Sequence, residues 1–309
     1  MFGNKTITEI SLLGFRSCGP CIPIFFALFL MAYLITLTGD FLIITLVSTS
    51  QRLQYPMFYF LKHLSISEIL FTTNITPNML HVLLRNGSIM SLAGCIIQFY
   101  VYIASGSVES VLLTIMSYDR YMAICNPLRY ADIMNLQLCR TLVSVTWFLC
   151  FTVVLTTVIL LCQLEFCGSN TIDHFFCDFD PLVALSCSDT FMVRTEVVIL
   201  SVPVVASSFS FIIWTYIYIF ITIFKISSSA GRQKAFSTCS SHLASVCSYY
   251  GPLIVIYMVP YQRNSINNNK FLSILYTVLT PLFNPLIYSL RNEELRLVLW
   301  KYLRLSTTV

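Results

Sequence analysis

Charged residues are scarce in this chain: Asp, Glu, Lys and Arg make up 10% of its 309 residues, whereas hydrophobic residues make up 57%. A water-soluble domain usually carries about 25% charged residues on its surface. This composition, with a mean hydropathy of +0.78, excludes an ordinary soluble domain. No polar stretch between the apolar segments is long enough for a separate soluble domain. The sequence therefore predicts an integral membrane protein.

The chain also lacks ten-residue segments of alternating polar and apolar residues, which excludes a transmembrane β-barrel. Instead, unbroken apolar segments recur, and each could cross about 30 Å of hydrocarbon as a helix. We expect an all-α membrane protein, a seven-transmembrane helix bundle. Its helices are expected within residues 22–47, 57–82, 92–115, 142–164, 197–224, 235–260 and 271–290.

The distribution of Lys and Arg gives the orientation, because basic residues in short loops are retained in the cytoplasm. With seven crossings, twelve of the eighteen basic residues fall on one side of the membrane. This asymmetry predicts an extracellular amino terminus. The first twenty residues contain no apolar h-region, so we expect no cleaved signal peptide. The basic residues form no single stripe, so no nucleic-acid partner is expected.

Four cysteines fall on the predicted outer side, where disulfides persist: Cys95, Cys167, Cys177 and Cys187. Four thiols allow three pairings. A bridge would order the loop at 165–190, which is too long and too polar for a tight turn. A metal site at His174, Cys177 and Asp178 is a less favoured alternative, since secretory-pathway thiols usually pair. We predict no cofactor and no resident metal.

An ionised pair, Asp119-Arg120, ends the third apolar segment. Charge at the edge of a membrane span is costly, which favours a functional role. The segment from Cys95 to Arg120 would extend roughly 37 Å as a helix, so it joins an outer thiol to an inner arginine. The plainer alternative is a helix-end arginine that snorkels to the cytoplasmic interface.

Four motifs occur in order along the chain, at 56–65, 116–125, 234–243 and 281–292. With them the chain resembles the vertebrate olfactory receptors, a family of rhodopsin-like G-protein-coupled receptors. The resemblance implies an extracellular amino terminus (1–21), a seven-transmembrane receptor domain (22–290) and a cytoplasmic tail with a short amphipathic eighth helix (291–309). It also implies the bridges Cys95–Cys177 and Cys167–Cys187.

The resemblance implies an odorant receptor and no enzyme activity. Such a receptor binds a small, volatile, mostly neutral molecule in the outer bundle, activates the heterotrimeric olfactory stimulatory G protein and raises cyclic AMP. It implies a multi-pass protein of the plasma membrane, in olfactory neuron cilia, with membrane lipid and receptor-transporting chaperones as further partners. The alternatives are a rhodopsin-like receptor for a non-odorant small molecule and, much less favoured, a transporter, for which we find no repeated halves. An intramembrane protease lacks its flanking motifs here.

Residue-by-residue comparison with the family implies a ligand-binding set on helices three, five, six and seven: Tyr102, Ile103, Gly106, Ser107, Leu200, Ser201, Val204, Leu253, Ile254, Tyr257, Ile274 and Thr277. About half of such a set would contact ligand, the rest being packing residues. Ser107, Ser201, Tyr257 and Thr277 are favoured as hydrogen-bonding groups. Tyr102 stands where amine receptors carry Asp, so a salt-bridged amine ligand is not expected.

The resemblance also implies a set for G-protein coupling and activation: Asp119, Arg120, Tyr121, Tyr216, Asn284, Pro285 and Tyr288. Arg120 is expected to be released on activation, while helix seven hinges at Pro285, where a backbone hydrogen bond is missing.

A third set, the inner polar cluster, comprises Asp40, Glu68, Glu109 and Asn284 at mid-membrane depth in four helices. An unpartnered carboxylate cannot stay ionised cheaply there. Asp40 departs from the family, which usually has Asn after the glycine at 39, and Glu68 replaces the usual Asp. The cluster is interpreted either as a cation or proton site or, with slight preference, as a hydrogen-bonded structural network.

Asn4 begins a glycosylation sequon on the predicted outer terminus, and Asn86 begins another in the first outer loop. The same pattern at Asn74 lies inside the predicted second helix, which shows how weak the motif is without topology. Cys18 and Cys21 could pair with each other or stay reduced.

Overall fold

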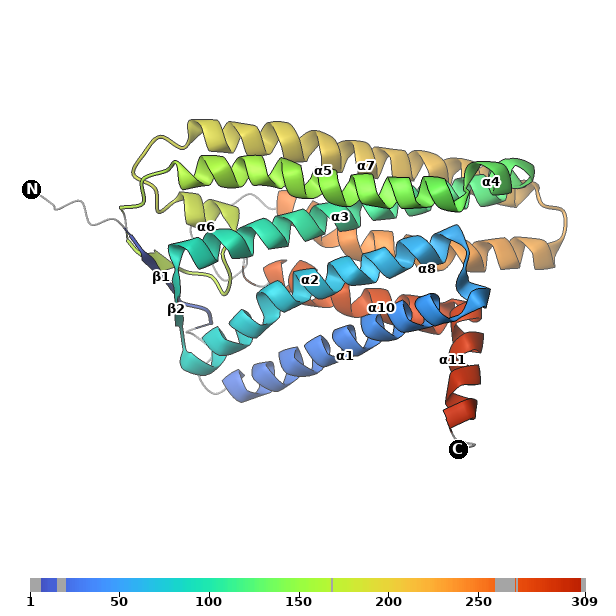
Figure 1. The fold of residues 1–309 in the computed structure, drawn as a ribbon, viewed down its shortest axis with the longest axis horizontal. Helices are drawn as coiled ribbons and strands as arrows, with labels where there is room; N and C mark the ends of the chain where they lie inside the picture. Colours follow the sequence, from blue (N-terminus) through green and yellow to red (C-terminus); the bar gives the residue numbers. More distant parts are fainter. Residues whose placement is uncertain (1–6, 16–20, 168, 259–269, 271, 307–309) are drawn as a thin grey trace, which may run out of the picture.

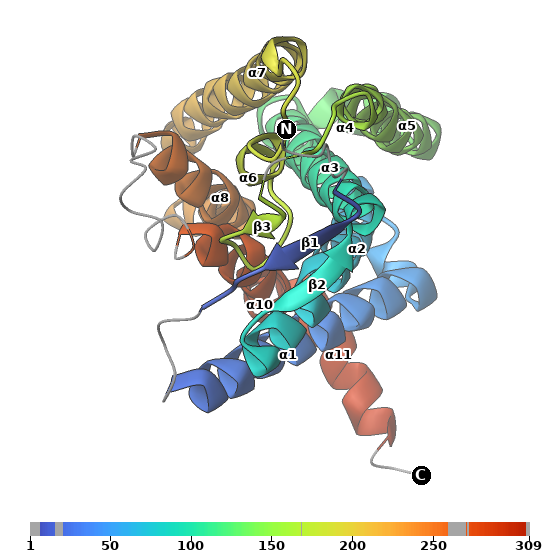
Figure 2. The same ribbon diagram turned by 90° about the vertical axis from the view of Figure 1, so that its left-hand side faces the viewer.

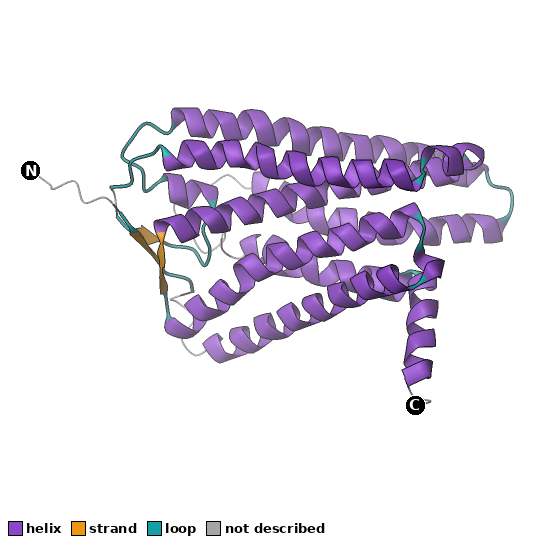
Figure 3. Ribbon diagram, viewed as in Figure 1, coloured by secondary structure: helices purple, strands orange, loops and turns teal. Residues whose placement is uncertain are grey.

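The structure is a computed structural model that describes residues 7–15, 21–167, 169–258, 270 and 272–306. Long helices lie side by side and form a bundle, with a small sheet at one end and the helix α11 (Glu293–Ser306) at the other (Figure 1). Helix is the dominant secondary structure, and the strands are confined to one end (Figure 3). The fold confirms the predicted membrane-helix bundle.

Six long helices form most of the bundle: α1 (Ile22–Thr49), α2 (Pro56–Arg85), α3 (Leu92–Cys125), α5 (Leu136–Cys162), α7 (Phe191–Lys225) and α8 (Ser229–Met258). The seventh segment combines a π-helical turn, η3 (Leu275–Leu279), with α10 (Thr280–Arg291). Within the described residues, α1, α3, α5, α7 and Leu272–Ser289 are long and apolar enough to cross a membrane. The other two, α2 and α8, have 30 residues each but carry more polar side chains.

Local sequence explains where several helices begin and end. Pro56 opens α2, where its missing N–H costs nothing. Asn86 then ends α2 in a left-handed conformation, with φ of 53°. The Ser91 hydroxyl accepts a hydrogen bond from Gly94 N at the start of α3, and Asn135 accepts one from Leu138 N at the start of α5.

Three shorter helical elements lie at the inner end, and one lies at the outer end. The inner ones are η2 (Gln51–Leu53), α4 (Pro127–Ile133) and α11. The amphipathic helix expected in the tail corresponds to α11, which buries Leu295 and Val298 and exposes Trp300. The outer one is α6 (Phe179–Val183). Neither α4 nor α6 was predicted from the sequence.

A three-stranded sheet closes the outer end of the bundle, which Figure 2 faces. Its central strand β1 (Glu9–Leu12) pairs antiparallel with β2 (Ser88–Ser91) and parallel with β3 (Thr171–Ile172). Ile10 and Leu12 on β1 are fully buried. The sheet was not predicted, because strands of two to four residues between polar loops are too short to show a hydrophobic periodicity. The sheet joins the amino-terminal segment to two outer loops.

The third helix is central, since α3 packs against α2, α5, α7 and α8. Its buried apolar residues include Val108, Leu112 and Met116. Large apolar side chains on helices at the periphery of the bundle are exposed instead, for example Phe148 on α5 and Phe224 on α7. In a membrane these surfaces face lipid tails.

Candidate functional site

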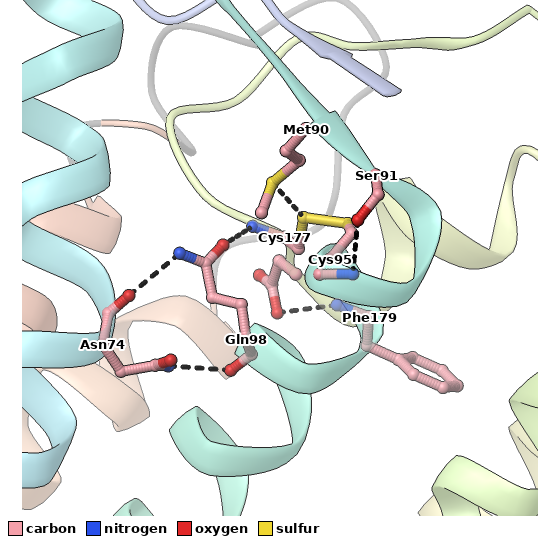
Figure 4. The surroundings of a disulfide bond; sticks show 9 residues. Asn74, Met90, Ser91, Cys95, Gln98, Cys177 and Phe179 are labelled. Carbon is pink, nitrogen blue, oxygen red and sulfur yellow. Dashed lines mark hydrogen bonds between the residues drawn. A yellow bond between two sulfur atoms is a disulfide. The ribbon is translucent and has the colours of Figure 1, made fainter. Parts of the chain in front are cut away.

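The outer loop between α5 and α7 is fastened to the top of α3. Cys177 forms a disulfide with Cys95, with their Cα atoms 5.4 Å apart. The Gln98 side chain accepts a hydrogen bond from Cys177 N at 2.9 Å and donates one to Asn74 O at 3.0 Å (Figure 4). Asn74 Nδ2 in turn donates to Gln98 O at 2.8 Å. Two helices and the loop therefore meet at Gln98.

A second disulfide joins Cys167 to Cys187 within the same loop, with Cα atoms 5.7 Å apart. The structure thus contains both bridges that the family resemblance implies. Since the sulfur of Cys177 is bonded to Cys95, Cys177 is not available for the alternative metal site. Of the predicted glycosylation and thiol residues, Asn4 and Cys18 lie outside the described residues, Cys21 is an exposed free thiol and Asn74 lies inside α2.

Polar contacts tie this loop to the seventh segment and to the amino-terminal strand. Lys270 Nζ donates to Asp173 Oδ1 at 2.5 Å and to Gly14 O at 2.8 Å. His174 Nε2 lies 3.2 Å from Ser273 Oγ. Burial, assisted by the positive charge of Lys270, lowers the pKa of His174 to about 3, so its ring is neutral at physiological pH.

The aromatic ring of Tyr102 occupies the space directly below the loop. Its hydroxyl donates to Tyr276 Oη at 3.1 Å. Its ring centroid lies 5.2 Å from that of Phe176 in the loop and 5.5 Å from that of Phe71 on α2. The disulfide between the neighbouring Cys177 and α3 holds Phe176 in contact with Tyr102. Tyr102, one of the predicted ligand residues, therefore packs directly beneath the outer loop.

The other predicted ligand residues on α3 are Ile103, Gly106 and Ser107, and they remain only half-buried although α3 is the central helix. Gly106 O accepts a hydrogen bond from Tyr249 Oη at 2.7 Å. Three predicted hydroxyls donate to carbonyls of their own helices: Ser107 to Ile103, Ser201 to Val197 and Thr277 to Ser273. A hydroxyl that donates in this way keeps its lone pairs for a ligand donor.

The remaining predicted ligand residues differ in exposure. Leu200, Leu253 and Ile274 are half-buried. Val204 and Ile254 are more open, with 42% and 40% of their surface exposed. The side chain of Tyr257 lies outside the described part of the structure.

The four residues of the inner polar cluster lie in the interior of the helix bundle, on α1, α2, α3 and α10. Asp40, Glu68, Glu109 and Asn284 are all buried, with at most 2% of their surface exposed. Asn284 donates to Glu68 Oε1 and accepts from Ser248 Oγ. Neither oxygen of the Asp40 carboxyl group, nor Glu109 Oε1, bonds to any described residue. Three buried carboxyl groups with so few donors cannot all stay ionised. Either at least one of them is protonated, or a cation binds among them.

At the inner end of α3, the Asp119 carboxylate is fully buried and holds Arg120. Arg120 donates to Asp119 Oδ2 through Nε at 3.0 Å and through Nη2 at 2.5 Å. Tyr130 on α4 donates to Asp119 Oδ1 at 2.8 Å. Burial and the adjacent carboxylate raise the pKa of Tyr130 above its ordinary value, so its hydroxyl stays protonated and keeps donating.

Tyr216 connects α7 with α8 next to this pair. Its hydroxyl lies 2.8 Å from His242 Nδ1, and His242 Nε2 lies 3.0 Å from Leu113 O on α3. A carbonyl only accepts, so Nε2 carries the hydrogen and Nδ1 accepts from Tyr216. Of the other predicted switch residues, Tyr121 packs on Trp214, and Tyr288 is buried with its hydroxyl unbonded to any described residue.

The segment around Pro285 lies against α1. A Cβ atom on Gly39 would come within 2.7 Å of Pro285 Cβ, so glycine permits the close approach of α1 and α10. Gly39 immediately precedes Asp40, and the approach therefore also sets where the inner polar cluster forms.

Several residues of these sites were not predicted from the sequence, among them Phe71, Gln98, Tyr130, Phe176, His242 and Tyr276. Most of them contact partners on other elements that are distant in the sequence, and single-sequence patterns give little signal for such contacts. Phe176 and Gln98 had one available clue, since Phe176 adjoins a bridging cysteine and Gln98 is a polar residue inside an apolar span.

Long apolar helices, an outer loop bridged to α3 by a disulfide and an Asp119–Arg120 ion pair at the inner end of α3 define a membrane-spanning helix bundle. A family model described as olfactory receptor matches residues 29–305. The chain is 42% identical to human Olfactory receptor 11L1 over 301 residues, 97% of this chain and 94% of that protein. It is 43% identical to human Olfactory receptor 11A1 over 306 residues (99% and 97%) and 43% identical to mouse Olfactory receptor 5P55 over 304 residues (96% and 96%).

The chain belongs to the olfactory receptor family. It is a multi-pass membrane receptor of the G-protein-coupled class and not an enzyme. The family and the fold predicted from the sequence are thereby confirmed.

Proposed function

We propose that this receptor binds a small, volatile, mostly neutral molecule in the outer half of the bundle, activates the olfactory stimulatory G protein and so raises cyclic AMP. One observation carries the proposal: α3 bears both Tyr102, below the outer loop, and Arg120, held at the inner end. The two residues are about 27 Å apart along the helix. Binding at one end can thus bias the other through a single rigid element.

The chemistry around Tyr102 supports a neutral ligand. The groups that contact Tyr102 are the rings of Phe71 and Phe176 and the hydroxyl of Tyr276, while the nearby carboxyl group of Asp178 already accepts a backbone hydrogen bond. No carboxylate stands at 102 to pair with an amine. An apolar wall with a few hydroxyls favours molecules with one hydrogen-bonding group.

Activation then requires a change at the inner contacts. The bonds that hold α8 against α3 and α7 run through His242, and those that hold Arg120 run through Asp119. A ligand that fits better when α8 has swung outward shifts the population toward that state. In that state Arg120 is free to contact the G protein.

The inner polar cluster serves in this proposal as a buried network that keeps one proton or cation among its carboxyl groups. The unbonded carboxyl of Asp40 supports a further expectation, that folding depends on receptor-transporting chaperones. Delivery to olfactory neuron cilia belongs to the same proposal.

The test is cyclic AMP in cells that express the chain with the olfactory stimulatory G protein, during exposure to an odorant panel. A concentration-dependent rise is expected, and Arg120→Ala at equal surface expression should abolish it. If only non-odorant molecules such as charged metabolites gave a rise, the ligand class would be wrong. A ligand-dependent response through a different G protein would contradict the coupling.

A further inference from the structure

A cavity of about 360 Å³ opens between the inner ends of α1, α2 and α5. Its back is apolar and buried, formed by Val47, Leu53, Met134 and Cys139. It lies away from the predicted ligand site, because its lining includes η2 and the first turns of α2 and α5 at the inner end. The volume suits a small polar headgroup.

Two basic side chains line this cavity without a counterion. Lys62 on α2 is half-buried, and Arg140 on α5 is exposed. Among the described residues, ion pairs form at Asp119–Arg120, Asp180–Arg194 and Asp173–Lys270, so neither Lys62 nor Arg140 belongs to one. The lining contains no Asp or Glu. A half-enclosed site with two positive charges and no negative one attracts anions.

The backbone adds to this positive field. Tyr55 and Pro56, at the start of α2, line the cavity, and so does Leu136, at the start of α5. The helices have 30 and 27 residues, and the first peptide N–H groups of a helix carry partial positive charge. Two helix starts and two side-chain cations therefore converge on one cavity.

We propose that this cavity binds the phosphorylated headgroup of an anionic phospholipid from the inner leaflet. Arg140 offers the phosphate a planar pair of donors, and Lys62 offers a point charge. Lys62 stands about 9 Å along α2 from its first residue, a depth at which headgroups and helix ends meet.

Neighbouring apolar surface provides room for the acyl chains. Leu136 at the edge of the cavity is 50% exposed, and Phe148, farther along α5 toward the membrane centre, is 70% exposed. Tyr55, 63% exposed at the same edge, is a side chain typical of the membrane interface. The bound molecule is thus a lipid, whose headgroup enters the cavity while its chains remain along α5.

The test compares lipid binding by the purified full chain and its variants. Native mass spectrometry would measure the affinity for phosphatidylinositol 4,5-bisphosphate added to receptor purified in neutral detergent. We expect Lys62→Gln combined with Arg140→Gln to weaken binding about thirtyfold, from the loss of two cation–phosphate contacts. Unchanged affinity in this variant would overturn the proposal.

Two further variants separate the cavity from general charge and from misfolding. Arg52→Gln with Arg129→Gln removes two exposed charges from the same side of the protein but outside the cavity lining, and it should leave the affinity unchanged. Lys62→Arg with Arg140→Lys keeps both charges and should restore binding. Equal losses in the cavity and control variants would contradict a defined site.

A final comparison distinguishes a lipid from a free phosphate compound. Soluble inositol 1,4,5-trisphosphate carries similar phosphate chemistry without acyl chains. We expect it to bind the full chain far more weakly than the lipid does. Equal affinities would show that the cavity binds a soluble headgroup and would overturn the assignment to the membrane.

Discussion

The side chain of Gln98 accepts a hydrogen bond from the backbone N–H of Cys177, whose sulfur is bonded to Cys95 one helical turn earlier on α3. The outer loop is therefore fixed to α3 covalently and by a buried polar contact at the same point. This double attachment places Phe176 over Tyr102 and so determines how far the outer loop lies from the predicted ligand residues on α3.

Replacing Gln98 by Ala should loosen this attachment. The substitution leaves the buried Cys177 N without its acceptor, which costs about 1–3 kcal/mol of unfolding free energy. Thermal unfolding of the purified receptor would measure the loss. Ile97→Ala is the matched control, because Ile97 is 61% exposed. An equal decrease in both variants would mean that Gln98 has no special role.

Replacing Asp40 by Asn should stabilise the receptor. The buried carboxyl of Asp40 has no bond to a described residue, and a neutral amide of the same size could donate to Glu68. We expect a gain of about 1–3 kcal/mol and higher surface expression, measured by thermal unfolding and by antibody labelling of intact cells. Asp132→Asn, at an exposed position on α4, should change neither. A loss of stability in Asp40→Asn would indicate that the ionised carboxyl is needed.

Replacing Tyr130 by Phe should raise ligand-independent signalling. The ring is kept, but the held state loses the hydrogen bond that orients and stabilises the buried Asp119 carboxylate beside Arg120. A shift of about tenfold in basal G-protein activation is expected from one hydrogen bond to a charged group. Tyr218→Phe, which alters an exposed tyrosine, is the control. Unaltered basal activity in Tyr130→Phe would argue that Tyr130 does not restrain Arg120.

Acidification should destabilise the outer loop through His174. The pKa of His174 is about 3 in the fold and 6.5 in the unfolded chain, so its stabilising contribution is complete above 6.5 and is lost as pH falls. Between pH 7.5 and 5.5 the loss is about 1.4 kcal/mol.

Thermal unfolding at the two pH values would measure this loss, which should be absent in His174→Gln and present in His81→Gln, an exposed histidine. Asp178 acts in the opposite sense, since partial burial raises its pKa to about 6. Asp178 contributes equally in wild type and in both variants, so its effect cancels when their pH-dependent losses are compared. Identical pH dependence in wild type and His174→Gln would refute the assignment.

Replacing Gly39 by Ala should separate α1 from α10. The new Cβ would lie 2.7 Å from Pro285 Cβ, and the proline ring cannot rotate away. Overpacking of this kind costs about 1–3 kcal/mol, which thermal unfolding would detect. Gly251→Ala is the control, because a Cβ there meets no atom within 4 Å, and this change should be neutral or stabilising. A Gly39→Ala receptor as stable as wild type would exclude a tight contact at this position.

The sequence by itself determined the membrane class, the helical spans and the family. Lipid offers no hydrogen bonds to a backbone, so an apolar run of sufficient length has to form a helix whatever surrounds it. Local composition is then enough to place the spans, and the motif at 116–125 adds the inner arginine. The cysteine positions narrowed the disulfides to three pairings, and only the resemblance selected one.

Beyond the disulfides and the inner polar cluster, only the tertiary structure decided which distant residues meet. The strand β1 becomes a strand because β2 and β3 offer it partners, and its own four residues specify little. Tyr130 reaches Asp119 through the position of α4, and Lys62 and Arg140 share a cavity because α2 and α5 pack at their inner ends. Such contacts depend on how helices pack, and packing is set by side-chain shapes summed over the bundle, which no local pattern encodes.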